Sequence, residues 1–152
     1  MGCARTLLVL ILCCMAPGGH AQDFLLTDLQ GTVQSLDRHR GQWVLLNLWA
    51  TWCAPCVAEM PMLQALDDAH DDLTVIGLAV DGADTARLTR FAKALKVHYP
   101  LVAGNLQIAR QFKARVFPTS ILYNPLGEPV LLHEGVLPAD VVLAAMNKRS
   151  AK

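Results

Sequence analysis

Residues 43–61 of the chain read WVLLNLWATWCAPCVAEMP. The run from Trp43 to Ala50 is short and apolar, which predicts a buried β-strand. Two cysteines follow, Cys53 and Cys56, separated by two residues. Pro55 between them suits the first turn of a helix, where a missing N–H group costs nothing. The stretch therefore predicts a strand that leads through a Cys-x-x-Cys turn into a helix.

Strands and helices alternate on both sides of this stretch. This alternation predicts a three-layer α/β fold. The other expected elements are a small hairpin from residues 24–26 and 32–33, the helix continuing to about residue 70, a buried strand at 73–80, a helix at 85–95, a shorter helix at 105–112, two strands at 119–123 and 130–133 joined by the turn Asn124-Pro125-Leu126-Gly127, and a closing helix at 139–149.

The length and the composition fit one folded domain. The chain has 152 residues, of which 53% are hydrophobic and 17% charged, and its formal net charge is zero. The apolar fraction is too high for a disordered chain. A nucleic-acid-binding protein would normally carry an excess of basic residues, so nucleic acid is not an expected partner.

Residues 1–21 have the features of a secretory signal peptide. Arg5 precedes an apolar run from Leu7 to Met15, and Gly19-His20-Ala21 offers small residues at both recognition positions of a cleavage site. The apolar run is far shorter than the ~20 residues that a membrane-spanning helix needs. We therefore expect cleavage after Ala21 and one folded domain at residues 22–152.

Two other fates of the leader remain open. Cys13 follows apolar residues, as in a lipoprotein signal, although Leu12 stands where that signal has a small residue. An uncleaved leader would instead tether the domain to the membrane. All three interpretations place the domain outside the cytoplasm, and the periplasm is the expected location.

Removal of the leader leaves only two cysteines. Three of the five, Cys3, Cys13 and Cys14, lie within residues 1–21, so the domain retains Cys53 and Cys56. An exported protein with a single closely spaced pair does not use it as a disulfide framework. A static disulfide and half of a metal site are the alternatives. A zinc site needs two further ligands, and the chain has no second Cys pair or His-x₃₋₅-His spacing to supply them.

The expected helix makes the two cysteines unequal. Cys53 would lie at the helix N-terminus, where unpaired N–H groups and the helix dipole favour a thiolate over a thiol. Cys56, one turn further along, would lie on the inner side. Cys53 is therefore the expected attacking sulfur, exposed and of low pKa, and Cys56 the shielded one that reacts second.

The segment Trp49-Ala50-Thr51-Trp52-Cys53-Ala54-Pro55-Cys56, together with Pro61 and the later Phe117-Pro118-Thr119, resembles the thioredoxin superfamily. Residues 47–61 are similar to the TlpA/ResA branch of exported thiol–disulfide oxidoreductases, and so are residues 23–36. The resemblance covers residues 23–147. It implies a thioredoxin fold, a central mixed sheet flanked by helices, with an N-terminal β-hairpin extension and a helix-containing central insert.

The resemblance also changes the interpretation of Pro118. From the sequence alone, Pro118 is predicted to start an edge strand after a trans bond, because X-Pro bonds are trans by default. The family instead has a cis-proline here, packed beside the redox pair, with the backbone of Phe117 available to a substrate chain. Trp49 and Trp52 are expected to pack around the pair, and Trp52 and Phe117 are the candidate substrate contacts.

Two polar residues next to the cysteines distinguish this chain from cytoplasmic thioredoxins. Asn47 stands where those proteins have a buried aspartate, and an amide cannot titrate. Glu59 follows Cys56 by three residues, so it faces the same side of the helix, and it matches a glutamate typical of the TlpA/ResA branch. Near an apolar site its pKa should rise, which suits a proton shuttle for Cys56. The alternative is a solvated carboxylate on the helix surface.

These residues predict thiol–disulfide exchange without a dissociable cofactor. The Ala54-Pro55 dipeptide lacks the histidine that stabilises the thiolate in strongly oxidising relatives, which favours a reductant. The resemblance implies client proteins with disulfides, often in cytochrome c or copper-centre assembly, and recharging by a membrane electron donor. Four histidines lie scattered within residues 22–152, and each is predicted to be a surface or an incidental residue: His39, His70, His98 and His133.

Three rival functions remain to be separated. A thioredoxin-like copper chaperone would use Cys53 and Cys56 as ligands, since Cu(I) accepts two thiolates; Met60 lies nearby but is expected in the core. An oxidising disulfide-exchange protein would use the same pair in the opposite direction. A thiol peroxidase would need Pro-x-x-x-Thr-x-x-Cys, whereas Thr51 lies only two residues before Cys53. Reduction of insulin without metal separates a reductant from the chaperone and the peroxidase.

Overall fold

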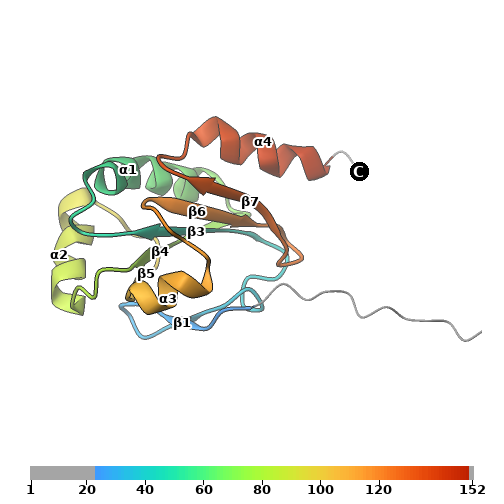
Figure 1. Cartoon of the computed structure of the whole chain (residues 1–152). Helices are drawn as coiled ribbons and strands as arrows, with labels where there is room; N and C mark the ends of the chain where they lie inside the picture. Colours follow the sequence, from blue (N-terminus) through green and yellow to red (C-terminus); the bar gives the residue numbers. More distant parts are fainter. Residues whose placement is uncertain (1–22, 151–152) are drawn as a thin grey trace, which may run out of the picture.

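The computed structural model describes residues 23–150, so the predicted leader, residues 1–21, lies outside the described residues. Strands and helices alternate as the sequence predicts, apart from one extra strand (Figure 1). The elements in chain order are β1 (Leu26–Thr27), β2 (Val33–Gln34), β3 (Trp43–Trp49), α1 (Ala54–Ala69), β4 (Leu73–Ala79), α2 (Thr85–Leu95), β5 (Leu101–Ala103), α3 (Leu106–Gln111), β6 (Thr119–Tyr123), β7 (Pro129–Glu134) and α4 (Ala139–Ser150).

The central sheet is mixed and has the strand order β5-β4-β3-β6-β7. Strand β3 pairs with β4 in parallel and with β6 in antiparallel orientation. Helices α1 and α4 lie on one face of the sheet, while α3 and the β1–β2 hairpin lie on the other (Figure 1). The expected thioredoxin fold, with a central mixed sheet, an N-terminal hairpin and a helix-containing insert between β4 and β6, is confirmed.

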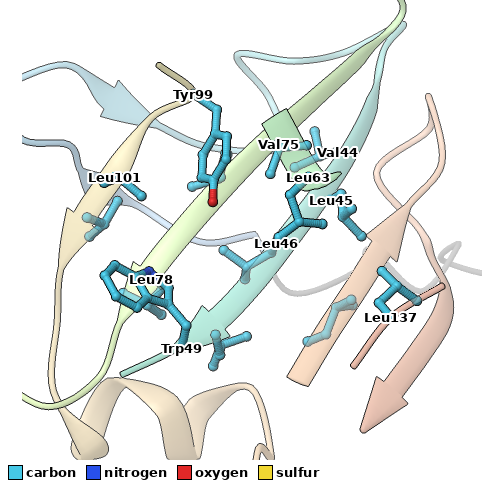
Figure 2. Close-up of a cluster of buried hydrophobic side chains, with 14 of the residues drawn as sticks. Val44, Leu45, Leu46, Trp49, Leu63, Val75, Leu78, Tyr99, Leu101 and Leu137 are labelled. Atoms are coloured by element: carbon cyan, nitrogen blue, oxygen red, sulfur yellow. The ribbon is translucent and has the colours of Figure 1, made fainter. Parts of the chain in front are cut away.

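Strand β3 is central because it is apolar on both faces. All of its residues are buried, and it forms ladders with a neighbour on each side. A strand covered by helices or loops on both faces favours such a continuous apolar run. The cluster around it includes Leu46 and Trp49 from β3 and Leu78 from β4 (Figure 2). The strand therefore fixes where its carboxyl end, and the cysteines beyond it, lie in the molecule.

Gly77 in β4 gives this cluster room for two aromatic residues. A Cβ atom at Gly77 would lie 2.6 Å from Leu101 Cδ2, 3.0 Å from the ring of Tyr99 and 3.3 Å from Nε1 of Trp49. Any side chain there would force the neighbours apart, because Cβ atoms do not approach other heavy atoms within 3.0 Å. The ring of Tyr99 points into the cluster across β4 (Figure 2).

The strand β5 was not expected from the sequence. It has only three residues and pairs in parallel with β4, and so short a segment carries no detectable alternation. The leading hairpin is confirmed, but its strands begin later than expected, at Leu26 and Val33. The turn Asn124–Gly127 joins β6 to β7 as predicted, with Gly127 at a φ of 75°. Within residues 23–150 no helix has the length and apolar character to cross a membrane.

Candidate active site

The two cysteines lie where strand β3 passes into helix α1. Cys53 is the N-cap residue of α1, and Pro55 lies in the first turn as predicted. Cys53 and Cys56 form a disulfide, with their Cα atoms 5.3 Å apart. The Cys53 N–H donates to the carbonyl oxygen of Ala50 at 3.1 Å, so the turn before the helix is closed by its own backbone.

The sulfur atoms of the two cysteines have different surroundings. The backbone N–H of Cys56 donates to Sγ of Cys53 at 3.3 Å, which leaves Sγ of Cys53 at the positive end of the helix dipole. Cys53 is 5% exposed and Cys56 is 0% exposed. The prediction that Cys53 is openly exposed is wrong, because the residue is largely covered. Cys53 is still the sulfur nearer the surface.

Part of the cover over Cys53 comes from the segment before β6. The carbonyl oxygen of Phe117 lies 3.7 Å from Sγ of Cys53. The Phe117–Pro118 bond is cis, so the trans bond expected from the sequence alone is wrong and the bond implied by the family resemblance is present. Pro118 is buried and precedes β6, and its carbonyl oxygen accepts a hydrogen bond from Gly135 N–H at 2.8 Å.

Exposed apolar side chains lie on three segments that are connected to the disulfide through the chain or through backbone contacts. Trp52 is 68% exposed, whereas Trp49 is fully buried, which settles the division between rim and core that the sequence left open. Val116, next to Phe117, is 48% exposed. Val136 is 54% exposed and directly follows Gly135, which bonds to Pro118. The sequence analysis missed Val116 and Val136, because nothing in the sequence places the β7–α4 loop beside Pro118.

Glu59 is buried beneath α1 rather than solvated on its surface. It is 4% exposed and shares the inner face of the helix with Cys56. Its Oε1 atom accepts from Asn47 Nδ2 at 2.8 Å, and its Oε2 atom accepts from the backbone N–H of Leu137 at 3.0 Å. Asn47 also donates to Ser120 Oγ at 3.0 Å. The interpretation of Glu59 as a surface carboxylate is therefore wrong.

Burial raises the pKa of Glu59 above its ordinary value of 4.5, because desolvation disfavours the charged form. The hydrogen bonds from Leu137 and Asn47, and the charge of His133, act against this shift and lower the pKa in part. His133 lies on β7, where its Nε2 atom is 3.0 Å from the carbonyl oxygen of Val136. The charge of His133 acts on the Glu59 carboxylate, an interaction that the sequence did not indicate.

The loop between β3 and the disulfide is tied to the end of β4. Thr51 donates to Asp81 Oδ2 twice, from its backbone N–H at 3.0 Å and from its hydroxyl at 2.6 Å. Val80 N–H donates to the carbonyl oxygen of Trp49 at 2.9 Å. Asp81 was not singled out from the sequence, where only the parallel pairing of β3 with β4 could have placed it near Thr51.

The chemistry available to this site is that of two thiols. Among residues 23–150 no group of three or more His, Cys, Asp or Glu side chains is placed to hold a metal ion. Met60, the nearest thioether in the sequence, is fully buried in the core. A dithiol with one sulfur at a helix N-terminus and a buried carboxyl group on the same helix face can exchange disulfides and move a proton.

Comparison with known proteins agrees with this geometry. The model of the AhpC/TSA family matches residues 17–143. The chain is 35% identical to thiol-disulfide oxidoreductase ResA of Geobacillus kaustophilus over 116 residues, which span 75% of this chain and 67% of that protein. It is 31% identical to the thioredoxin-like protein YneN of Bacillus subtilis over 123 residues, or 79% of this chain and 72% of that protein.

Solved structures show the same arrangement. A putative thiol:disulfide interchange protein DsbE from Chlorobium tepidum superposes with a TM-score of 0.70 at 30% identity, covering 84% of this chain and 96% of that one. An exposed lipoprotein thioredoxin of Streptococcus pneumoniae superposes with a TM-score of 0.72 at 25% identity, covering 84% and 99%. The chain therefore belongs to the AhpC/TSA family, and within it to the thiol–disulfide oxidoreductases, with Cys53 and Cys56 as its cysteine pair.

Proposed function

We propose that this thiol–disulfide oxidoreductase acts as a reductant of disulfides in exported client proteins. The observation that carries the proposal is the sparse set of donors at Cys53: its Sγ atom accepts from the N–H of Cys56. Ala54 and Pro55, between the cysteines, have no side-chain donors to add to it. A thiolate with little extra stabilisation leaves the dithiol form readily oxidised, which is the property of a reductant.

The first step is attack on the client. In the reduced protein the Cys53 thiolate attacks one sulfur of a client disulfide, so that a Cys53–client disulfide forms and one client thiolate leaves. The helix N-terminus stabilises the Cys53 thiolate before attack. The client approaches over the apolar rim of Trp52, Val116 and Val136 and meets the carbonyl oxygen of Phe117, 3.7 Å from the attacking sulfur.

The second step is resolution by Cys56. The Cys56 thiol gives its proton to the Glu59 carboxylate, and the resulting thiolate attacks Sγ of Cys53. The Cys53–Cys56 disulfide forms, the second client thiolate leaves, and two electrons have passed from the protein to the client. The raised pKa makes the Glu59 carboxylate a better proton acceptor than an ordinary glutamate.

The proposed location is the periplasm, with residues 1–21 as the export signal or as a membrane tether. A lipoprotein thioredoxin among the similar structures is described as exposed, which supports a site of action outside the cytoplasm. Recharging by a membrane electron donor returns the disulfide to the dithiol. Clients in cytochrome c or metal-centre assembly are the proposed class, as the resemblance to the TlpA/ResA branch implies. Fractionation of cells that express the full chain tests the location.

The decisive test is the reduction potential of the Cys53–Cys56 pair, measured against glutathione or dithiothreitol buffers. A value near the roughly −270 mV of thioredoxin supports the proposal. A value near the roughly −120 mV of DsbA would make the protein an oxidant. An insulin-reduction assay in the presence of a chelator then checks that reduction needs no metal.

A further inference from the structure

The side-chain amide of Asn47 is only half used in its hydrogen bonding. Asn47 is fully buried at the middle of β3, and its Nδ2 atom donates to Oε1 of Glu59 at 2.8 Å and to Oγ of Ser120 at 3.0 Å. An amide nitrogen has two hydrogens, so both donors are occupied. The Oδ1 atom is buried and has no hydrogen-bond partner among the described residues. A buried acceptor without a partner is unfavourable and calls for an explanation.

The position of Leu137 limits where Glu59 can carry a proton. Oε2 of Glu59 accepts from the backbone N–H of Leu137 at 3.0 Å, and a backbone N–H group can only donate. If Oε2 carried the proton, its O–H group and the Leu137 N–H group would be two donors facing each other, with no acceptor between them. A proton taken up by Glu59 belongs on Oε1, where it meets Nδ2 of Asn47, which is also a donor. In the observed orientation neither oxygen of protonated Glu59 has an acceptor for its hydrogen.

We propose that Asn47 turns its amide over when Glu59 takes up a proton, so that Oε1 of Glu59 faces a donor when it is ionised and an acceptor when it is protonated. Rotation by about a half turn around the Cβ–Cγ bond exchanges two groups of nearly equal size, and this torsion is roughly two-fold. Oδ1 of Asn47 then accepts from Oε1–H of Glu59. It also accepts from the hydroxyl of Ser120, because a hydroxyl group can serve as donor or acceptor.

This inference rests on the proposed role of Glu59 as the proton acceptor for Cys56, and it adds a positioning residue to that step. When the Cys56 thiol gives its proton to Glu59, Oδ1 of Asn47 accepts a hydrogen bond from the protonated carboxyl group. When Glu59 releases the proton, Nδ2 returns to stabilise the carboxylate. The groups that act on Glu59 are Asn47 on β3, His133 on β7, the N–H of Leu137 before α4, and Tyr99, whose own pKa is raised by burial and by the charge of Glu59. Cys56 shares the inner face of α1 with Glu59, and Ser120 on β6 contacts Asn47.

The direct test is an NMR titration of the oxidised wild-type protein, in which the cysteines do not titrate. Above the midpoint of Glu59 protonation, a through-hydrogen-bond coupling should join Asn47 Nδ2 to the carboxyl carbon of Glu59. Below the midpoint this coupling should vanish, while the Leu137 N–H keeps its coupling to the same carbon. Persistence of the Asn47 coupling on both sides of the midpoint would overturn the proposal.

A second test uses Glu59→Gln, which fixes the neutral state at every pH. The new side chain has one acceptor and one donor group, and the Leu137 N–H needs the acceptor. Its NH₂ group should therefore face Asn47, and a coupling should join that nitrogen to Cγ of Asn47. If Asn47 Nδ2 instead remains coupled to the new amide carbon, the proposal is wrong. This variant decides the question even if the wild type unfolds before Glu59 protonates.

The effect on the reaction is tested with Asn47→Leu and the control Leu46→Val, both at buried positions of β3. Hydrogen bonds to a charged group are stronger than those to a neutral one, so Asn47→Leu should shift the midpoint of the pH profile of the resolving step upward. Leu46→Val should leave the midpoint unchanged. Equal midpoints in all three proteins would overturn the role of Asn47. A protein that proves to be an oxidant would contradict the proposed function but leave both NMR results interpretable.

Discussion

The backbone N–H of Cys56 donates a 3.3 Å hydrogen bond to Sγ of Cys53, while Cys56 itself is fully buried. One cysteine thus supplies a donor to the other, and the helix stabilises negative charge on the sulfur at its start rather than on the one inside. We therefore expect Cys53 to attack first, because the thiolate is the nucleophile. On this view the backbone of α1 determines which cysteine binds the client.

Substitution of either cysteine should give opposite results in trapping experiments. Cys56→Ser removes the resolving thiol, so mixed disulfides between Cys53 and client proteins should accumulate. Cys53→Ser should trap almost none, because the remaining thiol is fully buried. Mass spectrometry of the trapped species measures both results and names the clients. Equal trapping by the two variants would contradict the assigned order.

The two thiols should also differ in their titration. The pKa of the Cys53 thiol should lie below the roughly 8.5 of a free cysteine, because of its place at the helix N-terminus. Alkylation of the reduced protein with iodoacetamide across pH, followed by peptide mapping, measures each thiol separately. Faster modification of Cys56 than of Cys53 near neutral pH would be inconsistent with the structure.

Glu59→Gln should change the pH dependence of exchange without unfolding the protein. The proton of Cys56 then has no carboxylate to receive it, so the resolving step should slow by about 10²-fold or more and lose its dependence on the protonation of Glu59. Stopped-flow measurement of resolution across pH tests this. The first step, attack by Cys53, serves as the internal control, since its rate should change little.

The same variant should alter how stability depends on pH. Because the pKa of Glu59 is raised in the folded protein, the folded state holds this proton more tightly than the unfolded chain. The resulting stability is fully present below the unfolded pKa of about 4.5 and is lost as pH rises through the folded pKa. Urea unfolding of wild type and Glu59→Gln should therefore show a gain for the variant at neutral pH that disappears in acid. A constant difference at every pH would contradict the raised pKa.

Trp52→Ala should weaken the reduction of protein clients more than the reduction of a small disulfide. The side chain is 68% exposed, so its removal costs little stability, but it takes away apolar area that a client chain would cover. The ratio of kcat/KM for insulin to that for a small aromatic disulfide measures the effect. Trp49→Ala is not a suitable control, because Trp49 is buried in the core. The matched control is Leu126→Ala, because Leu126 is an exposed apolar residue in the β6–β7 turn.

The sequence was sufficient for the fold because its signals were local. The apolar run of β3, the proline in the first turn of α1 and the turn at Asn124–Gly127 each predict their element from a few neighbouring residues, and the structure has all three. The short strand β5 could not be found in this way, because its three residues form a strand only through pairing with β4. Its existence depends on tertiary structure rather than on propensity.

The candidate site likewise contains residues that local sequence patterns predict and residues that only the tertiary structure brings together. Cys53, Cys56 and Glu59 lie on one helix, so their relation follows from spacing alone. The partners of Glu59 do not follow from spacing: Asn47 comes from β3 and Leu137 from the segment before α4. Ser120 of β6, which bonds to Asn47, is equally remote in the sequence. The Asn47–Glu59 contact spans 12 positions of the sequence and the Glu59–Leu137 contact spans 78. Both depend on the order of the strands in the sheet, which no local pattern in the sequence encodes. The covered state of Cys53 escaped prediction for the same reason, since its cover comes from Phe117.

The contact between Thr51 and Asp81 gives the last prediction. Asp81 accepts both the N–H and the hydroxyl of Thr51, and these two hydrogen bonds join the segment after β4 to the loop that carries Cys53. Asp81→Ala leaves two donors of a buried residue without their acceptor, which should cost about 1–3 kcal/mol of stability and slow the reduction of clients. Asp81→Asn retains one acceptor oxygen and should recover most of both losses.

A control is available three residues further along the chain. Asp84 caps α2 by accepting the N–H of Arg87, so Asp84→Ala should also lower stability, by about 1 kcal/mol, without loosening the cysteine loop. Urea unfolding of the oxidised proteins and insulin reduction by the reduced ones give the two readouts. Loss of activity in Asp81→Ala but not in Asp84→Ala would assign Asp81 to positioning Cys53, whereas an equal loss of activity in both would reduce its role to general stability.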